Sequence, residues 1–396
     1  MRYLLINSLK FGGAEKVAQI LSDAGVFDKI ITLEDEQDFP LGVPIMKLSG
    51  HTQATSSALK TIFIPVYAWR LRRILRGGDV VVSFIERANF VNICAKIISG
   101  HKAVIALHTN ISSSFKTLKK YPYYLLIKML YPRADAVISV SKGINDDFKR
   151  IISFKRYNSV IYNPIDLISV NSLKSEVLGF SDELMQNSLI TVGRLFYQKA
   201  QWTLLKTFSG LLGKIPGAKL FIIGDGDLRG QLLAYAAGLG LKVFSVFSNP
   251  IAEIDSSYDV YFLGFQKNPY KFMARATVFV LSSVSEGMPM VVLEAMACGL
   301  PVVSSDCNYG PREILLSGGK KFGLLVPVLD YKISEDIDTA DKGHGEWLEA
   351  FSGLLNDEEK RREYQELSLA RAEDFSISQI KAIWRELFEK IEDKKE

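Results

Sequence analysis

The stretch Val278-Phe-Val-Leu-Ser-Ser-Val-Ser-Glu-Gly-Met-Pro-Met-Val-Val-Leu-Glu-Ala-Met-Ala297 passes from an apolar run, through a short polar loop, into a second apolar segment. Its first part, Val278–Ser283, is typical of a buried strand. Gly287 permits a tight turn or a close approach to a ligand. After the loop, apolar residues recur at a helical spacing and form a stripe that we expect to face a core, namely Val291, Val292, Ala295 and Met296. A buried strand that leads directly into a helix is the unit of a doubly wound parallel sheet.

The same alternation of strands and helices occurs along most of the 396 residues. Near the N-terminus, the strand Tyr3–Ile6 is followed by a glycine turn and by helical periodicity over 14–24. The second half repeats this order with the strand Leu189–Val192, a turn at Gly193 and a helix over 201–212. Further strands are predicted at 80–84, 103–107, 136–140, 219–223 and 301–305. The fold class is therefore α/β, with two tandem Rossmann-like domains and a ligand cleft expected between them at the carboxyl ends of the strands.

The length of the chain also favours two domains over one ordinary core. A polar stretch around 165–187 marks the boundary, and two segments, about 245–258 and 331–346, resemble insertions without an assigned function. We predict an N-terminal domain over 1–167, a C-terminal domain over 168–375, and a charged amphipathic helix over 376–396 whose register favours packing.

The composition fits a globular protein of a reducing compartment. Hydrophobic residues make up 48% and charged residues 23% of the chain, and its three cysteines form no Cys-x-x-Cys pair that would suggest structural zinc. The N-terminal apolar run is too short for a signal peptide, and no run approaches the ~18 apolar residues that span a bilayer. We therefore expect a cytoplasmic protein, either free or peripheral on the cytoplasmic face of the membrane.

The net charge of +4 conceals an asymmetry between the two halves. Residues 1–167 contain 23 basic and 13 acidic side chains, whereas the remainder contains 25 basic and 31 acidic ones. The basic surplus indicates an anionic partner for the N-terminal half, either a membrane surface or a phosphorylated ligand. Nucleic acid is not expected, because no DNA- or RNA-binding motif accompanies the charge.

Two carboxylates mark the opening stretch as a candidate site. Glu286 lies in the strand-to-helix loop, and Glu294 lies inside the helix among apolar neighbours. A carboxylate in such surroundings needs hydrogen-bond donors, which the hydroxyls of a sugar or a ribose would supply. Their spacing alone also fits a glutamate that interacts with the helix dipole and another that is exposed at the rim.

Other candidates follow strands elsewhere in the chain. Arg194 and Lys199 come after a strand of the second half, where two cations suit a diphosphate, although solvated surface cations are the alternative. Gly12 and Gly13 stand at a strand-to-helix junction, where backbone N–H groups can face a phosphate, but such turns are common in α/β proteins. His108 ends a strand of the first half, so it is a candidate to exchange a hydrogen bond with a sugar hydroxyl or a purely structural histidine.

The run Gly224-Asp-Gly-Asp227 contains an Asp-x-Asp pattern that also occurs in metal sites. The flanking glycines and the preceding strand favour a turn that lines a nucleotide. Elsewhere the sequence offers no cluster of His, Asp and Glu at metal-binding spacing. We therefore expect neither a metal nor a cofactor.

Together these motifs resemble the retaining glycosyltransferases of family 4, which have the GT-B fold. The matching pieces occur in family order from residue 11 to about 313, and the Glu-x7-Glu run with its Arg/Lys partner is the most specific of them. The overall pattern is similar to the hexosyl and N-acetylgalactosaminyl transferases of bacterial lipid-linked oligosaccharide assembly. The pieces are Gly12-Gly13-Ala14-Glu15, His108, Asn163-Pro-Ile-Asp166, Val192-Gly-Arg-Leu195 with Lys199, Ile223-Gly-Asp-Gly226, Leu263-Gly-Phe265, and Glu286 through Glu294.

The resemblance implies a nucleotide-diphosphate-sugar donor, with uridine as the expected base, bound mainly by the C-terminal domain. By this analogy Arg194 and Lys199 hold the diphosphate, Glu294 binds the ribose, and Glu286 with the backbone after it holds the sugar. Front-face transfer with retention and without a metal would then use His108, Arg194, Lys199 and Glu286 as catalytic residues. The implied donor site comprises Gly13, Gly193, Arg194, Lys199, Gly224, Phe265, Glu286, Gly287, Met288, Pro289 and Glu294, and the implied acceptor site comprises Gly12, Glu15 and His108.

Two basic segments of the N-terminal half contain interleaved aromatic residues, as interfacial helices do. Arg70–Arg76 follows Tyr67 and Trp69, and Lys116–Lys128 includes several tyrosines. We expect peripheral membrane contact through these segments and a polyprenyl-diphosphate-linked glycan as the acceptor. An ordinary core-packing helix with a solvated basic face is the alternative.

Three other functions stay open. A sugar-nucleotide epimerase or hydrolase of the same fold would share the nucleotide site but lack an acceptor groove. A non-catalytic scaffold would have no use for the full set of charged residues. A metal-dependent transferase would use Asp225 and Asp227.

Overall fold

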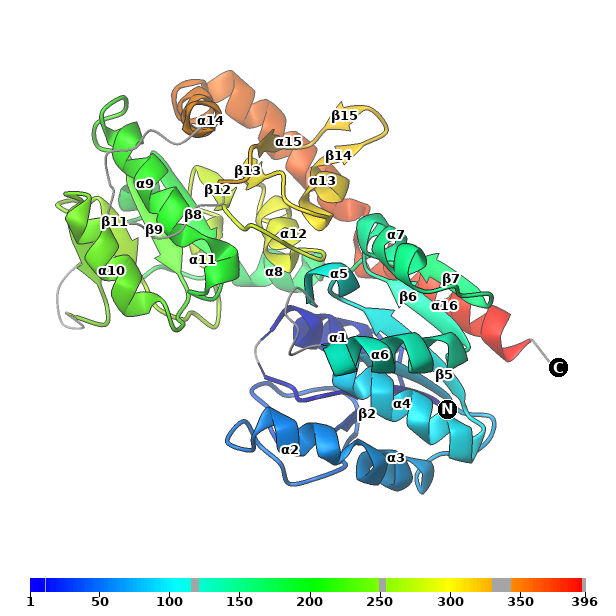
Figure 1. The fold of residues 1–396 in the computed structure, drawn as a ribbon. Helices are drawn as coiled ribbons and strands as arrows, with labels where there is room; N and C mark the ends of the chain where they lie inside the picture. Colours follow the sequence, from blue (N-terminus) through cyan, green and yellow to red (C-terminus); the bar gives the residue numbers. More distant parts are fainter. Residues whose placement is uncertain (11, 115–120, 249–253, 330–342, 394–396) are drawn as a thin grey trace. The chain divides into compact units, whose positions relative to one another are not determined.

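The computed structural model describes residues 1–10, 12–114, 121–248, 254–329 and 343–393. They form two compact units, Met1–Pro164 with Phe375–Glu396, and Ile165–Asp374 (Figure 1). The second unit therefore begins where the polar stretch 165–187 begins, and the chain returns to the first unit at Phe375. The middle of the first insertion-like segment, 249–253, and most of the second, within 330–342, lie outside the described residues.

The first unit is built on a seven-stranded sheet whose described strand pairs are all parallel. In spatial order its strands are β3 (Ile45–Lys47), β2 (Lys29–Thr32), β1 (Arg2–Ile6), β4 (Val80–Phe84), β5 (Lys102–Leu107), β6 (Ala136–Ser139) and β7 (Tyr157–Val160). Its helices are α1 (Gly13–Asp23), α2 (Ser57–Ile62), α3 (Ile64–Arg72), α4 (Glu86–Ser99), α5 (Ile111–Ser114), α6 (Tyr121–Leu130), η2 (Tyr131–Arg133), α7 (Lys142–Ile151) and α16 (Ile377–Glu392). The sequence predicted β1, β4, β5 and β6 because these strands are almost wholly buried and apolar.

The C-terminal helix α16 packs against α1 of the first unit. Its Trp384 and Phe388 meet Phe27 edge to face, with ring centroids 5.7 and 6.2 Å apart. All three aromatic side chains are buried. The amphipathic register of the C-terminal segment therefore serves to complete the core of the N-terminal unit.

The second unit contains another seven-stranded sheet with parallel pairings. In spatial order its strands are β10 (Val243–Ser245), β11 (Val260–Phe262), β9 (Lys219–Ile223), β8 (Ser188–Val192), β12 (Val278–Leu281), β13 (Val302–Ser305) and β16 (Leu324–Val326). A small hairpin pairs β14 (Leu316–Ser317) with β15 (Lys320–Lys321). The helices are α8 (Leu167–Leu173), η3 (Asp182–Met185), η4 (Tyr197–Lys199), α9 (Gln201–Leu212), α10 (Arg229–Gly238), α11 (Tyr270–Met273), α12 (Met290–Ala297), α13 (Gly310–Leu315), α14 (His344–Asn356) and α15 (Glu358–Glu373).

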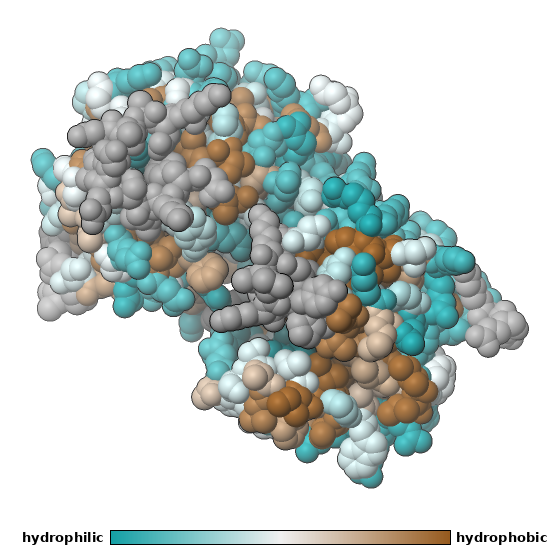
Figure 2. All heavy atoms as spheres, in the orientation of Figure 1, coloured by the Kyte–Doolittle hydropathy of each residue, from teal (hydrophilic) through white to brown (hydrophobic). Residues whose placement is uncertain are grey.

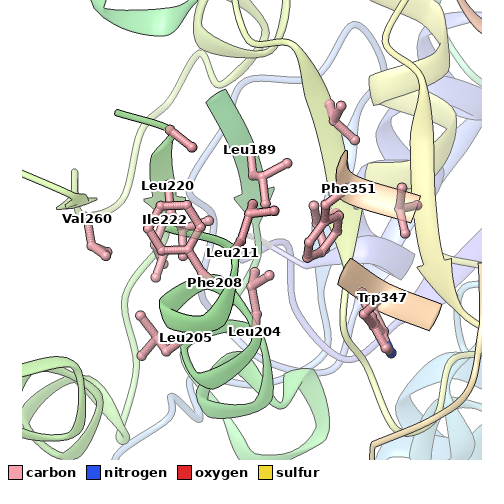
Figure 3. Packing of buried hydrophobic residues seen from close by; sticks show 14 of the residues in the cluster. Leu189, Leu204, Leu205, Phe208, Leu211, Leu220, Ile222, Val260, Trp347 and Phe351 are labelled. Atoms are coloured by element: carbon pink, nitrogen blue, oxygen red, sulfur yellow. The ribbon is translucent and has the colours of Figure 1, made fainter. Parts of the chain in front are cut away.

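One face of this sheet is covered by α9 and α14, which contact each other. Figure 3 shows Phe208 of α9 over Leu220 and Ile222 of β9, and Leu204 and Leu211 of α9 nearer to Trp347 and Phe351 of α14. These side chains are almost wholly inaccessible to solvent. Their burial fixes the position of α9, and with it the loop that precedes this helix.

The helix α12 is buried on more of its surface than the predicted apolar stripe. Met290 and all residues from Val292 to Ala297 are buried, including Glu294, and Val291 is half-buried. The reason is that α12 packs against α15 and α8 as well as against the sheet. A helix with protein on nearly every side has no solvent-facing stripe to reveal its orientation.

Both sheets reverse their strand order beside their first strand. In the first sheet β1 lies between β2 and β4, and in the second β8 lies between β9 and β12. Open α/β sheets bind ligands outside the carboxyl ends of the strands at such a point. Each unit therefore has one favoured binding edge, at β1/β4 and at β8/β12.

Candidate active site

The β8/β12 edge joins a cation and a carboxylate that follow different strands. Lys199 is the last residue of the turn η4 after β8, and Glu286 lies in the loop after β12. The ammonium nitrogen of Lys199 lies 2.6 Å from Oε1 of Glu286. Both are largely shielded, with side-chain exposures of 23% and 9%. The ion pair therefore forms in a half-buried setting, where it is stronger than at an open surface.

Hydrogen bonds hold the two loops together around this ion pair. The Ser283 hydroxyl donates to the same carboxylate oxygen of Glu286 at 2.6 Å. The Ser282 hydroxyl donates to the Lys199 carbonyl at 2.8 Å, and the Val284 amide donates to the Gln198 carbonyl at 2.9 Å. The two loops thus form one pre-organised edge.

The loop after β13 also fixes the backbone of Glu286. Its amide donates to the Asn308 carbonyl at 2.9 Å, and its own carbonyl accepts the Tyr309 amide at 2.7 Å. Glycine is required at Gly310, because a Cβ there would lie 2.5 Å from the Gly287 carbonyl oxygen. After this contact the chain passes through the buried Met288 to Pro289, which precedes the first turn of α12.

The turn after β8 and the turn after β9 approach each other closely. Gly224 has φ 139°, and a Cβ on it would lie 2.0 Å from the Gly193 carbonyl oxygen. Any side chain at this position would force the two turns apart. The Gly224 amide donates to the Gly264 carbonyl at 2.8 Å, and the next residue, Phe265, is 51% exposed. An open aromatic face therefore stands beside the glycine turns.

Arg194 follows Gly193 and is exposed to solvent. Its carbonyl accepts a hydrogen bond from the Gln201 side chain at 3.0 Å, which fixes the backbone at this point. Within the described residues its guanidinium forms no ion pair. The same edge thus provides one paired cation, Lys199, and one cation that is available to an anionic ligand.

Glu294 has a different environment from Glu286. It lies on α12, is 5% exposed, and accepts a hydrogen bond from the Tyr270 hydroxyl at 3.1 Å. Burial, and then the charge of Glu294, raise the pKa of the Tyr270 phenol, so that it stays a donor. Burial and the same carboxylate raise the pKa of the Cys298 thiol to about 12. The two glutamates therefore do not share the partners described for them.

Asp225 is already engaged within the turn. Its carboxylate accepts from the Gly226 amide at 2.7 Å and pairs with Arg229 at 3.0 Å. No group of three or more His, Cys, Asp or Glu side chains arranged for a metal occurs among the described residues. These contacts favour a turn-stabilising role for Asp225 over a metal ligand.

The predicted residues of the N-terminal half lie in the first unit. Gly12, Gly13 and Glu15 stand at the start of α1, and His108 follows β5. The Nε2 atom of His108 is fully enclosed and has no hydrogen-bond partner among the described residues. Burial lowers the pKa of His108 to about 4, so its imidazole is neutral at pH 7. Of the Asn-Pro-Ile-Asp motif, Asp166 caps α8 by accepting the Ser169 amide at 3.0 Å.

The basic N-terminal segments are partly described. α3 ends at Arg72, before the last two arginines of the predicted cluster, and Tyr67 and Leu71 face the interior. Arg73 lies over the Trp69 ring, 3.6 Å from its centroid. Residues 115–120 of the other segment lie outside the described part. Within that part, none of the helices combines the length and the apolar character that crossing a bilayer requires.

Sequence reasoning missed the residues that support the site. Ser283 and Gln198 lie beside predicted residues, and their positions in loops after strands were the available signal. Tyr270 gave no signal, because it lies 24 residues from Glu294 on a separate short helix.

Two family models cover most of the chain. Residues 12–168 match the model described as Glycosyltransferase Family 4, and residues 180–342 match that of Glycosyl transferases group 1. An uncharacterised glycosyltransferase of Methanocaldococcus jannaschii is 31% identical over 355 residues, which cover 81% of this chain and 82% of the relative. The N-acetylgalactosamine-N,N'-diacetylbacillosaminyl-diphospho-undecaprenol 4-alpha-N-acetylgalactosaminyltransferase of Campylobacter jejuni is 28% identical over 388 residues, covering 95% of this chain and 96% of that protein.

A solved structure has the same architecture. Anabaena HepE, crystallised in complex with UDP, is similar with a TM-score of 0.73 over 98% of this chain and 99% of that one. Its sequence identity of 19% limits the likeness to the fold. The predicted GT-B fold of two Rossmann-like domains is confirmed.

Proposed function

This chain belongs to the group 1 and family 4 glycosyltransferases, and on that premise we propose that it moves a hexose or N-acetylhexosamine from a uridine-diphosphate sugar to a polyprenyl-diphosphate-linked glycan. The observation that carries this proposal is the edge formed by Arg194, Lys199 and Glu286 at the strand-order reversal of the C-terminal unit. It offers two cations for a diphosphate and a fixed carboxylate for sugar hydroxyls.

In the proposed reaction the bond between the anomeric carbon and the β-phosphate oxygen breaks, and the acceptor hydroxyl attacks from the same face. The proton of that hydroxyl passes to the departing phosphate, and the sugar keeps its anomeric configuration. Arg194 and Lys199 stabilise the negative charge that develops on the diphosphate. Glu286 orients the donor sugar and keeps the ammonium of Lys199 in place.

The nucleoside half of the donor fits the neighbouring groups of the same unit. Glu294 is proposed to bind the ribose hydroxyls, and Tyr270 supplies a neutral donor that stabilises its buried charge. Phe265 offers an exposed ring beside the Gly224 turn for the base. We propose that no metal takes part, because Arg229 already neutralises Asp225.

The acceptor is proposed to be held by the N-terminal unit, with Gly12, Glu15 and His108 as its contacts. The Campylobacter relative acts, by its name, on a diphospho-undecaprenol substrate, which supports a lipid-linked acceptor here. His108 lines a small pocket, its imidazole is neutral, and its Nε2 has no partner among the described residues, which suits a hydrogen bond to a hydroxyl.

An exposed apolar face supports the proposed peripheral contact with the membrane. Figure 2 shows hydrophobic residues gathered on the N-terminal unit, in the lower half of the view. Leu59, Ile62, Val66 and Trp69 recur at intervals of three and four residues along α2 and α3 and are all exposed. Exposed arginines 70, 72, 73 and 76 adjoin this row. Apolar residues beside cations suit the interface of an anionic bilayer.

Vesicle sedimentation tests this part of the proposal. The protein should sediment with phosphatidylglycerol vesicles at low salt, and Ile62→Asp should abolish much of the binding. The control Val177→Asp changes an equally exposed apolar residue of the other unit and should bind as wild type. Equal binding of both variants would contradict the proposed face.

The transfer itself is tested by product analysis. Incubation with a uridine-diphosphate sugar and a lipid-linked oligosaccharide should release uridine diphosphate only when this acceptor is present. Addition of a chelator should leave the release unchanged. NMR of the product should show the anomeric configuration of the donor. Release without an acceptor would favour the hydrolase or epimerase alternative, and an inverted product would refute retention.

A further inference from the structure

The β1/β4 edge of the N-terminal unit carries a carboxylate to which the proposed reaction has given no role. β4 ends at Phe84, and α4 begins two residues later at Glu86. In the second unit the strand order reverses at β8, and β12 is its neighbour on one side. Glu286 lies in the loop after β12. In the first unit the strand order reverses at β1, and β4 is the corresponding neighbour. Glu86 therefore follows β4 as Glu286 follows β12.

The residue between strand and helix has a strained backbone. Ile85 has φ 72° and ψ 148°, a conformation that residues with a branched Cβ rarely adopt. Such conformations persist only where the surrounding structure holds them, and they cluster at ligand-binding sites. Here the strained turn sets the direction in which the first turn of α4 begins.

This turn is held by side chains from the loops after two other strands, β5 and β2. The Thr109 hydroxyl, after β5, donates to Oε1 of Glu86 at 2.8 Å. On the other side Arg87 pairs with Glu34, after β2, at 2.9 Å, and Glu34 also pairs with the buried Lys60 at 2.7 Å. The side chain of Glu86 is therefore positioned before any ligand arrives.

The helix behind Glu86 is equally fixed. Asn92 donates to the Val81 carbonyl at 2.9 Å, and Asn89 accepts from the Ser83 hydroxyl at 2.8 Å. These polar groups are buried between α4 and the strands, where each unmade hydrogen bond would be costly. They fix the register of α4 on the sheet, and a fixed supporting shell is what a binding site needs.

Glu86 and His108 line one small pocket, together with Asn89, Thr109, Tyr131 and five aliphatic residues. The enclosed Nε2 of His108 lacks a partner among the described residues. Thr109 uses one oxygen of Glu86, and no contact of the other oxygen is found within the described part of the chain. A carboxylate beside a neutral imidazole offers both acceptors and a donor, which neighbouring sugar hydroxyls require.

We propose that Glu86 binds the acceptor by accepting a hydrogen bond from a hydroxyl of its terminal sugar, adjacent to the hydroxyl that attacks. Thr109 is a positioning residue that holds the Glu86 carboxylate. The inference rests on the proposed function, since it assigns a role within that reaction. It also defines the acceptor as a sugar with at least two neighbouring free hydroxyls.

Steady-state kinetics of the full-length protein test this role, with a polyprenyl-diphosphate oligosaccharide ending in N-acetylgalactosamine as the probe. Glu86→Gln should raise the acceptor KM about five- to tenfold, because the neutral amide oxygen is a weaker hydrogen-bond acceptor than the carboxylate oxygen. Thr109→Val should raise it about two- to tenfold. The donor KM and the thermal stabilisation by uridine diphosphate should stay at wild-type values in both.

Asp35→Asn is the matched control, because Asp35 follows β2 at the same edge but is exposed and pairs with Lys47. It should leave every parameter unchanged. An unchanged acceptor KM in Glu86→Gln, or equal losses in both KM values and stability, would overturn the role of Glu86 alone. A wild-type protein that binds uridine diphosphate but transfers sugar to no acceptor, or that binds no nucleotide, would instead refute the proposed function.

Discussion

The ammonium of Lys199 and the hydroxyl of Ser283 both lie 2.6 Å from Oε1 of Glu286, so one carboxylate oxygen joins the loops after β8 and β12. The pair is shielded from water, and its cation faces the edge where a diphosphate is proposed to bind. A carboxylate with this geometry holds the Lys199 ammonium in place and is suited to the proposed contact with a sugar hydroxyl.

Replacement of Lys199 by alanine should reduce kcat by about 10²- to 10³-fold, because a charge-stabilising donor to the leaving group is lost. Rapid-quench measurement of product formation at saturating donor separates this loss from weaker binding. Arg362→Ala is the control, since Arg362 lies on α15 and forms an exposed pair with Glu358. A variant of Lys199 with wild-type kcat would contradict the electrostatic role.

Tyr270→Phe should destabilise the protein by about 1–3 kcal/mol, because a buried carboxylate loses one of its hydrogen-bond donors. The Tyr270 hydroxyl donates to Glu294, which is 5% exposed. Urea denaturation monitored by circular dichroism measures the change. The double variant Tyr270→Phe/Glu294→Gln should recover part of the loss, and no recovery would show that the two groups are not coupled.

Gly224→Ala should destabilise the C-terminal unit by more than about 1–3 kcal/mol, because it adds a steric clash to backbone strain. Its φ of 139° and the 2.0 Å approach of a Cβ to the Gly193 carbonyl oxygen are the reasons. Gly230→Ala is the matched comparison, since α10 leaves open space there. It should stabilise the protein by about 0.5–1 kcal/mol. Equal thermal midpoints for the two variants would refute the account of this turn.

The stability of the N-terminal unit should depend on pH through its buried histidines. Burial lowers the pKa of His108 from 6.5 to about 4, and that of His101 likewise to about 4. Between these values the unfolded chain binds more protons than the folded one, so stability rises with pH. The stability that the neutral, buried histidines contribute is complete above pH 6.5 and is lost progressively as the pH falls towards 4.

Urea midpoints measured from pH 4 to 7.5 should therefore decrease towards low pH. His108→Gln should show a shallower decrease, with the share of His101 retained. An identical profile in the variant would mean that His108 titrates normally in the folded protein.

The sequence identified the strands that are buried on both faces and the residues that follow them. β4 and β9 were predicted with their observed bounds, because short continuous apolar runs between turns favour strands that are buried on both faces. β7 was missed, since each of its residues is only half-buried and its composition is mixed. The parallel sheet then brings Lys199 and Glu286 together, because β8 and β12 are neighbours.

Two features of the candidate site could not be predicted in this way. Tyr270 approaches Glu294 only through the packing of α11 on α12, which no periodicity reveals. Glu86 gave no such signal, because no glycine marks the turn after β4, where Ile85 adopts a positive φ. Strain at a non-glycine residue is visible only in the structure.

The most direct test of the central claim is a thermal-shift screen of nucleoside diphosphates and their sugars with wild-type protein and Glu294→Ala. Uridine diphosphate and its hexose or N-acetylhexosamine sugars should raise the wild-type midpoint most, since a ligand at about 100 times its Kd stabilises by about 2.7 kcal/mol. Glu294→Ala should lose most of this shift. An unchanged wild-type midpoint with every nucleotide would contradict a nucleotide-sugar site at the β8/β12 edge.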